Sequence, residues 1–244
     1  MTVAIKNTLC AVAAAFILCL APCALADTTA TLTLTSAGNN VMDGVYVGPY
    51  YANITSGGVT QYNQQVICDD FKDDSYVGHT WTATVNTFAD LSHTLWGAQI
   101  LSQPGGTMAQ VTQLYNEAAW LAVTMMSLPS SQQGLYSFAI WAIFSPDAVK
   151  NVVTANEWTA ISGLISTAKS QKFSPGQFAN FLIYTPLNKP GVSCVVGSCP
   201  AQEFFVIQTP EGGAALLYLL FAGLACMVAM RFRVRQALPG KRMA

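Results

Sequence analysis

The sequence predicts an α+β fold with antiparallel strands at the N-terminal end, a central cluster of three to four helices, a closing C-terminal strand and one transmembrane helix. Three observations predict it. Apolar and polar side chains alternate within residues 31–87, apolar side chains recur every three or four positions within 108–168, and residues 212–230 carry no charge. These patterns are typical of strands, of amphipathic helices and of a membrane span, respectively.

The N-terminus predicts a secretory signal peptide over residues 1–26. Lys6 precedes an apolar stretch over 9–20, which is shorter than the ~20 residues needed to span a bilayer. Small residues then stand at Ala24 and Ala26. We therefore expect signal peptidase to recognise these two alanines and cleave after the second one. A membrane anchor and a lipoprotein signal are the less favoured alternatives.

Strands are predicted between Thr31 and Thr87. Leu32 and Leu34 alternate with threonines, and Trp81 alternates with threonines in the same way. Because successive side chains of a strand point to opposite faces, each apolar set lines one face of a sheet. Turn signals separate the strands at residues 38–40, 43–44 and 57–58.

Three helices are predicted in the middle of the chain. The first has an apolar face over residues 108–125, and the second is apolar nearly all round over 135–144. Ser130 with Gln133 forms a capping-box pattern before the second helix, and Thr154 with Glu157 forms one before the third. The inward side of the third helix is predicted to hold Trp158, Ile161, Leu164, Ile165 and Ala168.

Two further elements complete the exported domain, which we assign to residues 27–208. Ser174-Pro175 is typical of a helix start, so a short fourth helix is predicted there. Residues 204–207, Phe-Phe-Val-Ile, suit a closing strand. Strands followed by helices predict the α+β class.

The exported part is acidic. Residues 27–210 contain five lysines, no arginine and eleven acidic residues, a net charge of −6 at neutral pH. Nucleic-acid binding depends on lysine and arginine neutralising phosphates, and the basic residues cluster only near the C-terminus. The composition therefore excludes nucleic acid as a partner.

The C-terminus predicts a membrane helix over residues 212–230. Arg231, Arg233 and Arg235 follow it directly, and a basic tail covers 236–244. Such cationic clusters stay in the cytoplasm, so the exported domain lies on the other side of the membrane.

The order Thr209-Pro210-Glu211, apolar helix and arginine cluster resembles the PEP-CTERM sorting signal of Gram-negative bacteria over residues 209–235. Gly212 replaces the second proline of the usual Pro-Glu-Pro. The resemblance implies recognition by an exosortase-type membrane transpeptidase and a link to exopolysaccharide or biofilm, with extracellular polysaccharide as a partner. A permanent single-pass anchor is the alternative.

Three cysteines remain in the exported part. Cys194 and Cys199 flank a short loop, Val-Val-Gly-Ser, and an oxidising compartment favours a disulfide between them. Cys68 is then left without a partner. We expect this thiol to be buried and inert, because a free cysteine packs as a small hydrophobic residue.

Cys68 and the later Ala139-Ile140-Trp141 resemble the thioester domains of bacterial surface adhesins, in which a cysteine and a glutamine form the bond that captures a target. The family's glutamine stands four residues before the tryptophan, and this position holds Ser137. A hydroxyl group cannot supply the acyl group, so we expect no thioester there. Gln133 lies one helical turn upstream and is the remaining candidate.

Four aspartates follow Cys68 at close spacing. A solvated turn is the favoured interpretation, and a calcium site is the alternative, although the spacing does not match an EF-hand. Apart from this alternative, no cofactor is expected. The four residues are Asp69, Asp70, Asp73 and Asp74.

Neither histidine, His79 nor His93, stands at zinc-ligand spacing or in a nucleophile motif. The sequence therefore predicts a noncatalytic, exported cell-surface or extracellular-matrix protein. The alternatives are an adhesin or ligand-binding module of thioester-domain-like fold and an unrecognised secreted hydrolase. Five aromatic residues are candidates for a sugar-stacking surface, although core packing is the more common role: Tyr50, Tyr51, Tyr62, Trp81 and Trp96.

Overall fold

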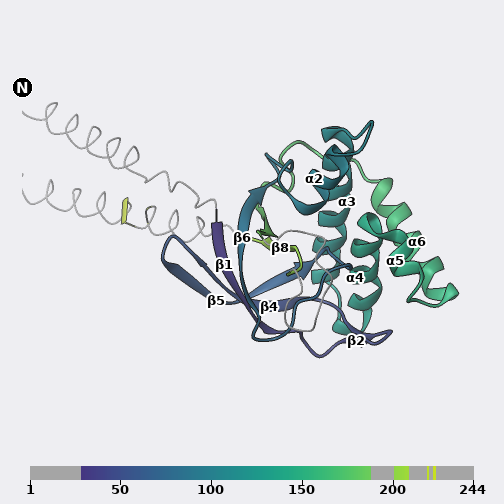
Figure 1. Cartoon of the computed structure of the whole chain (residues 1–244), viewed down its shortest axis with the longest axis horizontal. Helices are drawn as coiled ribbons and strands as arrows, with labels where there is room; N and C mark the ends of the chain where they lie inside the picture. The colour runs from purple at the N-terminus through teal and green to yellow at the C-terminus, as the bar shows by residue number, and fades with distance from the viewer. Residues whose placement is uncertain (1–28, 188–200, 209–218, 220–221, 224–244) are drawn as a thin grey trace, which may run out of the picture.

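In the computed structural model, six antiparallel strands close into a barrel, and the helices gather on one side of it (Figure 1). The structure describes residues 29–187, 201–208, 219 and 222–223. The predicted α+β class is confirmed. Around the barrel the order is β1-β4-β5-β8-β7-β6. The strands are β1 Thr29–Ser36, β4 Tyr50–Ser56, β5 Val59–Cys68, β6 Thr80–Thr87, β7 Phe181–Pro186 and β8 Phe204–Ile207.

The alternation in β1 sets which face of the barrel wall is apolar. Ala30, Leu32 and Leu34 are buried, and the intervening threonines lie toward the outside. Leu32 pairs with Trp81 of β6, so the two predicted strands are neighbours. This register stacks the apolar faces of both strands toward one core.

Two of the predicted turns form tight hairpins. Gly57 and Gly58 join β4 to β5 with φ values of 56° and 76°. Asp43 and Gly44 join β2 (Val41–Met42) to β3 (Val45–Tyr46) with φ values of 51° and 79°. Positive φ at both central positions is typical of the turns whose twist matches a hairpin.

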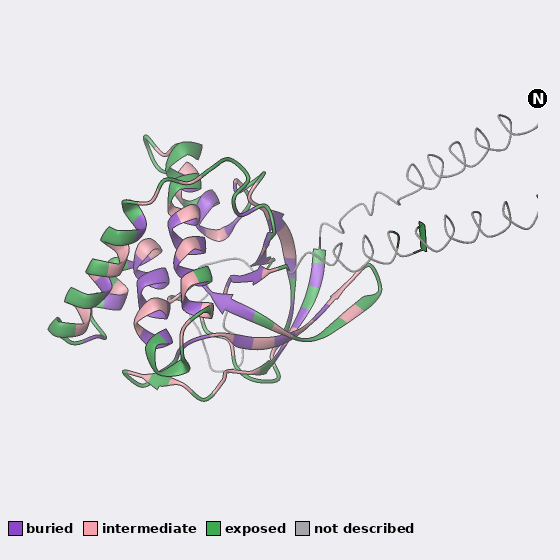
Figure 2. Cartoon of the chain, turned by 180° about the vertical axis from the view of Figure 1, so that it is seen from behind, coloured by how far each residue is buried: buried purple, intermediate pink, exposed green. Residues whose placement is uncertain are grey.

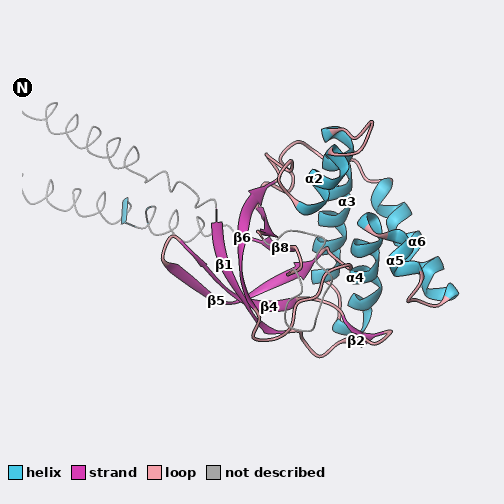
Figure 3. Cartoon of the chain, in the orientation of Figure 1, coloured by secondary structure: helices cyan, strands magenta, loops and turns pink. Residues whose placement is uncertain are grey.

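The helices form a layer in which α4 is central (Figure 3). It packs against α3, α5 and α6 and also contacts β5. Burial on most of its sides explains the absence of a polar stripe in its sequence (Figure 2). The helices are α2 Leu95–Leu101, α3 Met108–Met126, α4 Ser130–Phe144, α5 Pro146–Lys150 and α6 Ala155–Lys169.

One predicted helix cap is confirmed and one is wrong. Thr154 and Glu157 form the capping box of α6. In α4, by contrast, Pro129 occupies the cap position and makes no side-chain cap. The Gln133 side chain instead donates to the carbonyl oxygens of Met125 at 3.3 Å and Leu128 at 3.0 Å. It therefore caps the end of the preceding helix α3.

The end of the domain differs from the prediction. Residues 175–180 form turns and not a helix. Three elements were not predicted: the short helices α2 and α5, and strand β7, which lies between β6 and β8 and completes the barrel wall. The closing strand over 204–207 is confirmed. In α6 only Ile161 and Ala168 of the predicted inward residues are fully buried, because this helix lies at the outer edge of the helical layer (Figure 2).

Several predicted features lie outside the described residues. These are the signal peptide over 1–26, the Cys194 to Cys199 loop, and the sorting signal over 209–235 apart from positions 219, 222 and 223. In the part of the chain that is described, no helix has the length and apolar character that a bilayer crossing requires.

Candidate ligand-binding site

The end of strand β5 carries the cysteine and aspartates that the sequence singled out. Cys68 is 2% exposed, and Asp69 and Asp70, which follow it directly, are both 0% exposed. Asp73 is half-buried and Asp74 is exposed. The prediction of a solvated turn is therefore wrong for its first half, because the chain leaves the barrel beneath the helices and not into solvent.

The Cys68 thiol is enclosed by its own loop. Its Sγ donates to the Asp70 carbonyl oxygen at 3.0 Å and accepts from the Asp70 backbone N–H at 3.4 Å. Burial raises the pKa of the thiol well above its ordinary value, and the charges of Asp70 and Asp69 raise it further. The predicted burial of Cys68 is confirmed, and its surroundings favour the thiol over the thiolate.

The tryptophan of the adhesin-like pattern does lie beside Cys68. The Trp141 indole faces the thiol closely enough to lower its pKa, although its N–H does not reach hydrogen-bonding geometry. Ser137, one turn earlier, accepts from the Gly48 backbone N–H at 2.8 Å and donates to Met125 Sδ at 3.4 Å. Cys68, Ser137 and Gln133 therefore each hydrogen-bond to different groups.

A buried glutamate that sequence reasoning missed lies at the centre of the fold. Glu203 precedes β8 and is 0% exposed. Its Oε1 accepts from the Tyr115 hydroxyl at 2.6 Å, and its Oε2 accepts from the Leu95 backbone N–H at 2.7 Å and from the Thr185 hydroxyl. Glu203 thereby joins β7, the start of α2 and the middle of α3. A lone acid before an apolar strand was the only sequence signal.

Asp69 is the neighbour of this glutamate. Its backbone N–H donates to the Glu203 carbonyl oxygen at 3.4 Å, and neither of its carboxyl oxygens has a protein donor. Burial raises the pKa of both carboxyl groups, and the Glu203 charge raises that of Asp69 further. Donors surround only Glu203, so Glu203 is the ionised partner and Asp69 holds the proton.

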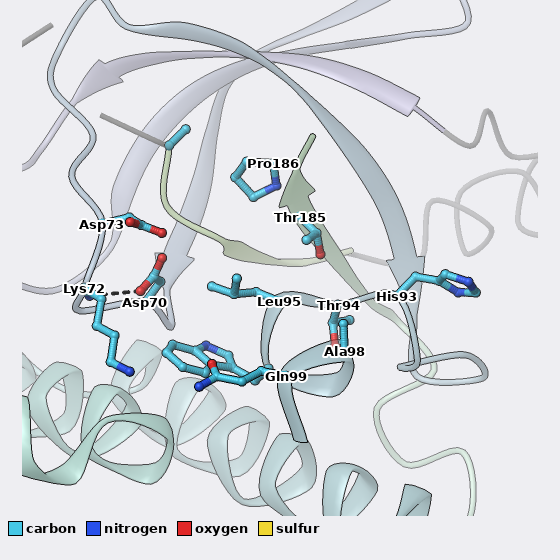
Figure 4. A pocket seen from close by; sticks show the side chains of 12 residues that line it. Asp70, Lys72, Asp73, His93, Thr94, Leu95, Ala98, Gln99, Thr185 and Pro186 are labelled. Atoms are coloured by element: carbon cyan, nitrogen blue, oxygen red, sulfur yellow. Dashed lines mark hydrogen bonds between the residues drawn. The ribbon is translucent and has the colours of Figure 1, made fainter. Parts of the chain in front are cut away.

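A cavity of about 580 Å³ lies next to this cluster, between the turn after β5, the start of α2 and the end of β7 (Figure 4). Asp70 and Asp73 line it on one side. Asp70 Oδ1 accepts from the Lys72 backbone N–H at 2.9 Å, while its Oδ2 is buried without a partner. Leu95, Ala98 and Pro186 supply apolar surface.

The carboxyl groups of Asp70 and Asp73 influence each other strongly. Burial, together with the nearby Asp73, raises the pKa of Asp70 to about 8, against the lowering effect of the Lys72 N–H. Burial also raises the pKa of Asp73, whereas its interaction with Asp70 lowers it. With a pKa near 8, the Asp70 carboxyl group keeps its proton at neutral pH.

Lys72 compensates this pair only in part: its charge lowers the pKa of Asp73, but it forms no salt bridge with either aspartate. Its Nζ lies 5.4 Å from the centre of the Trp96 ring, and Trp96 in turn stacks on Phe144 at 5.3 Å. In Figure 4 the Lys72 side chain extends away from the Asp73 carboxyl group. The lysine is therefore held by a cation–π contact at the cavity wall.

The predicted metal alternative finds no matching geometry. In the described ranges, no three His, Cys, Asp or Glu side chains come together in a way that could hold a metal ion. The four aspartates are divided, since Asp69 faces Glu203, Asp70 faces Asp73, and Asp74 is exposed.

The two histidines have local roles. His93 Nδ1 lies 2.9 Å from Ser92 Oγ and 3.3 Å from Asp90 Oδ2. A catalytic triad needs serine and aspartate on opposite ring nitrogens, and here both contact the same one. His93 borders the cavity next to α2, and its ring lies on the side opposite to Asp70 and Asp73 (Figure 4). His79 stacks on Tyr76 at 4.7 Å, and burial lowers its pKa.

The five aromatic residues considered for sugar stacking do not form one surface. Tyr50, Trp81 and Trp96 are buried in the core, where Tyr50 and Trp81 both contact Phe204. Tyr62 is 72% exposed on β5. Core packing is thus the role of most of the set.

No protein-family model and no curated protein matches this chain. Its structural neighbours are thioester-domain adhesins, at weak similarity. A thioester domain of a Clostridium perfringens surface protein has a TM-score of 0.45 at 9% identity and covers 74% of this chain and 99% of its own. The thioester domain of the fibronectin-binding protein SfbI from Streptococcus pyogenes has a TM-score of 0.39 at 7% identity and covers 75% of this chain and 93% of its own.

The N-terminal domain of the Streptococcus pyogenes pilus tip adhesin Cpa has a TM-score of 0.41 at 9% identity and covers 76% of this chain and 95% of its own. With TM-scores this low, the likeness establishes neither a common chemistry nor a common ligand.

Proposed function

We propose that this chain is an exported, noncatalytic surface protein whose domain over residues 27–208 binds a ligand noncovalently in the cavity beside α2. The observation that carries the proposal is a cavity of about 580 Å³ bordered by Asp70, a buried carboxyl group with one oxygen unpartnered. A buried polar atom without a partner is costly, so a ligand that satisfies it gains free energy. The enclosed Cys68 thiol supports noncovalent binding over covalent capture.

Delivery to the surface belongs to the same proposal. The signal peptide over 1–26 directs export, and the PEP-CTERM-like segment over 209–235 directs processing by an exosortase-type transpeptidase near Pro210-Glu211. Support comes from the order of the sequence features alone. Removal of residues 212–244 should shift the protein from membrane and surface fractions to soluble exported fractions. Recovery from the cytosol with residues 1–26 attached would contradict export.

A matched pair of variants tests ligand binding. Ala98 is exposed on α2 and lines the cavity, so Ala98→Phe fills it, whereas Ala160→Phe adds the same ring to the exposed side of α6. Small neutral, cationic and anionic compounds are screened against the full chain by saturation-transfer NMR. We expect hits that Ala98→Phe abolishes and Ala160→Phe retains. The absence of any such hit would contradict the proposal.

A second candidate is a covalent adhesin, favoured by the contact between Cys68 and Trp141. It requires a bond between the Cys68 sulfur and the Gln133 side-chain carbonyl carbon, with loss of ammonia. Gln133 now donates to two carbonyl oxygens at the end of α3. The intact mass of the exported protein decides: a mass lower by one ammonia supports the covalent adhesin, and the unmodified mass supports noncovalent binding.

A further inference from the structure

The Asp70 and Asp73 carboxyl groups form a part of the cavity wall at which no described residue makes a salt bridge. Asp70 Oδ2 is buried and unpartnered, and Asp73 faces it across the rim (Figure 4). The nearest cation, Lys72, is held over Trp96. Among the described residues, one ion pair is formed, between His93 and Asp90. It lies just before α2, on the side away from Asp70 and Asp73. A cationic group of a ligand would therefore complete this wall.

We propose that the Asp70–Asp73 pair binds a guanidinium group, as carried by an arginine side chain of a partner protein; this inference rests on the proposed function of the cavity. A guanidinium presents several N–H donors in a planar fork, so one edge can serve both carboxyl groups. It is also more weakly hydrated than an ammonium ion, which lowers the cost of meeting the buried Asp70 oxygen.

The remaining walls fit the stem of such a side chain. Leu95, Ala98 and Pro186 give apolar surface on which a three-carbon chain can lie. Anionic ligands are disfavoured by the carboxyl pair and by the net charge of −6 over residues 27–210. Because this stretch contains no arginine, the guanidinium has to come from another molecule or another part of the chain.

Binding is coupled to a proton. The groups that face Asp70 are the Asp73 and Asp69 carboxyl groups, Glu203 behind them and Lys72 on the same turn. Asp70 holds its proton at neutral pH, and the guanidinium, which stays charged, takes the place of that proton. Both carboxyl groups then ionise and the proton passes to solvent, so about one proton is released per ligand bound at pH 7.

Calorimetry on the full chain tests the inference with n-butylguanidinium, n-butylammonium and 1-butanol. We expect the guanidinium to bind about tenfold tighter than the ammonium and to release a proton, seen as a dependence on buffer ionisation enthalpy. Butanol should not bind measurably. A blocked arginine, Nα-acetyl-arginine N-methylamide, should bind about as tightly as butylguanidinium. If the blocked arginine does not bind, an arginine side chain of a partner protein cannot be the ligand.

Substitutions locate the site. Asp73→Asn and Asp70→Asn should each weaken butylguanidinium binding by about tenfold or more. Asparagine at position 70 keeps the acceptor for the Lys72 N–H, and Asp73 is only half-buried, so both variants should fold, as thermal melting will verify. Asp147→Asn removes the same charge on exposed α5 and should change affinity by less than about twofold.

Two results would overturn the inference. One is equal or tighter binding of butylammonium. The other is an equal loss of affinity in Asp147→Asn, which would indicate a general charge effect. If butanol or another screened compound binds in the cavity without a preference for guanidinium, the guanidinium inference is wrong. The proposed noncovalent binding function is then still supported. Failure of every screened compound to reach the cavity removes the proposed function itself.

Discussion

Glu203 ties together elements that are distant in the chain. Its two carboxyl oxygens accept from Tyr115 on α3, from the first N–H of α2 at Leu95, and from Thr185 on β7. The Glu203 carboxylate accepts from the backbone N–H of Leu95 at the start of α2, where a negative charge is favourable. A buried charge with this many donors stabilises the barrel against the helices only while the whole set is present.

Replacement of this carboxylate should therefore be costly. Glu203→Ala leaves the Leu95 N–H and two hydroxyl groups without their acceptor, and we expect the free energy of unfolding to fall by about 3–5 kcal/mol. Urea unfolding measures it. The control is Glu157→Ala, which removes the capping acid of α6 at the surface and should lower the free energy of unfolding much less. Equal effects of the two variants would contradict the role given to Glu203.

The Cys68 thiol should resist modification in the folded protein. It is enclosed by the Asp70 backbone, and its pKa is raised by burial, so little thiolate forms and no reagent reaches it. Peptide mapping after iodoacetamide treatment at about pH 8 should find Cys68 unmodified in buffer and modified in urea. Rapid modification in buffer would show instead that the loop opens and would favour the covalent adhesin.

At the scale of elements, the regular patterns were predictable and the junctions were not. Strands β1 and β6 and helices α3 and α6 each have one buried face, which gives a clear period in the sequence. Strand β7 is buried on most of its residues and has little alternation, and α2 has only 7 residues. Neither carries a period long enough to detect.

The α3–α4 junction shows how a correct pattern led to a wrong role. Ser130 and Gln133 have capping-box spacing, but Pro129 takes the cap position and the glutamine turns back to α3. Its side chain is 8% exposed, so contact with the preceding helix and not with solvent determines its direction. The spacing of Ser130 and Gln133 cannot distinguish a cap at the start of α4 from a cap at the end of α3. In both cases the side chain satisfies backbone groups that lack a partner within the helix.

Gln133→Ala tests this junction. Loss of the donor to the Met125 and Leu128 carbonyl oxygens should lower the free energy of unfolding by about 1–3 kcal/mol, measured by urea unfolding. Gln132→Ala is the matched control, since that glutamine is exposed on the same turn and should change stability by less than about 0.5 kcal/mol. A cost confined to Gln132→Ala would contradict the capping role.

At the scale of the whole molecule, the acidic site was only half visible in the sequence. The aspartates after Cys68 stood out as a local cluster, but their partners Glu203 and Tyr115 are distant in the chain. Closure of the barrel by β8 places Glu203 beside Asp69. Three aspartates of the predicted solvated turn thus belong to two buried carboxyl pairs, Asp69 with Glu203 and Asp70 with Asp73.

These pairs predict an unusual pH dependence of stability. The folded pKa of Asp70 is raised to about 8, and those of Asp69, Asp73 and Glu203 are also raised by burial. The unfolded chain loses the same protons near pH 4, so the folded state binds more protons above that pH. The stabilisation is complete at acidic pH and is lost as the pH rises through the folded pKa values.

The free energy of unfolding should therefore fall between about pH 6.5 and 8.5, by about 2 kcal/mol from Asp70 alone. His79, whose lowered pKa gives the opposite slope, overlaps only the lower end of this window, and Asp90, whose pKa is also lowered, matters only in acid. Denaturant titrations at fixed ionic strength measure the slope. Asp70→Asn should reduce it, and Asp147→Asn should leave it unchanged. Stability that rises with pH across this window would mean that these carboxyl groups are already ionised in the folded protein below about pH 6.5.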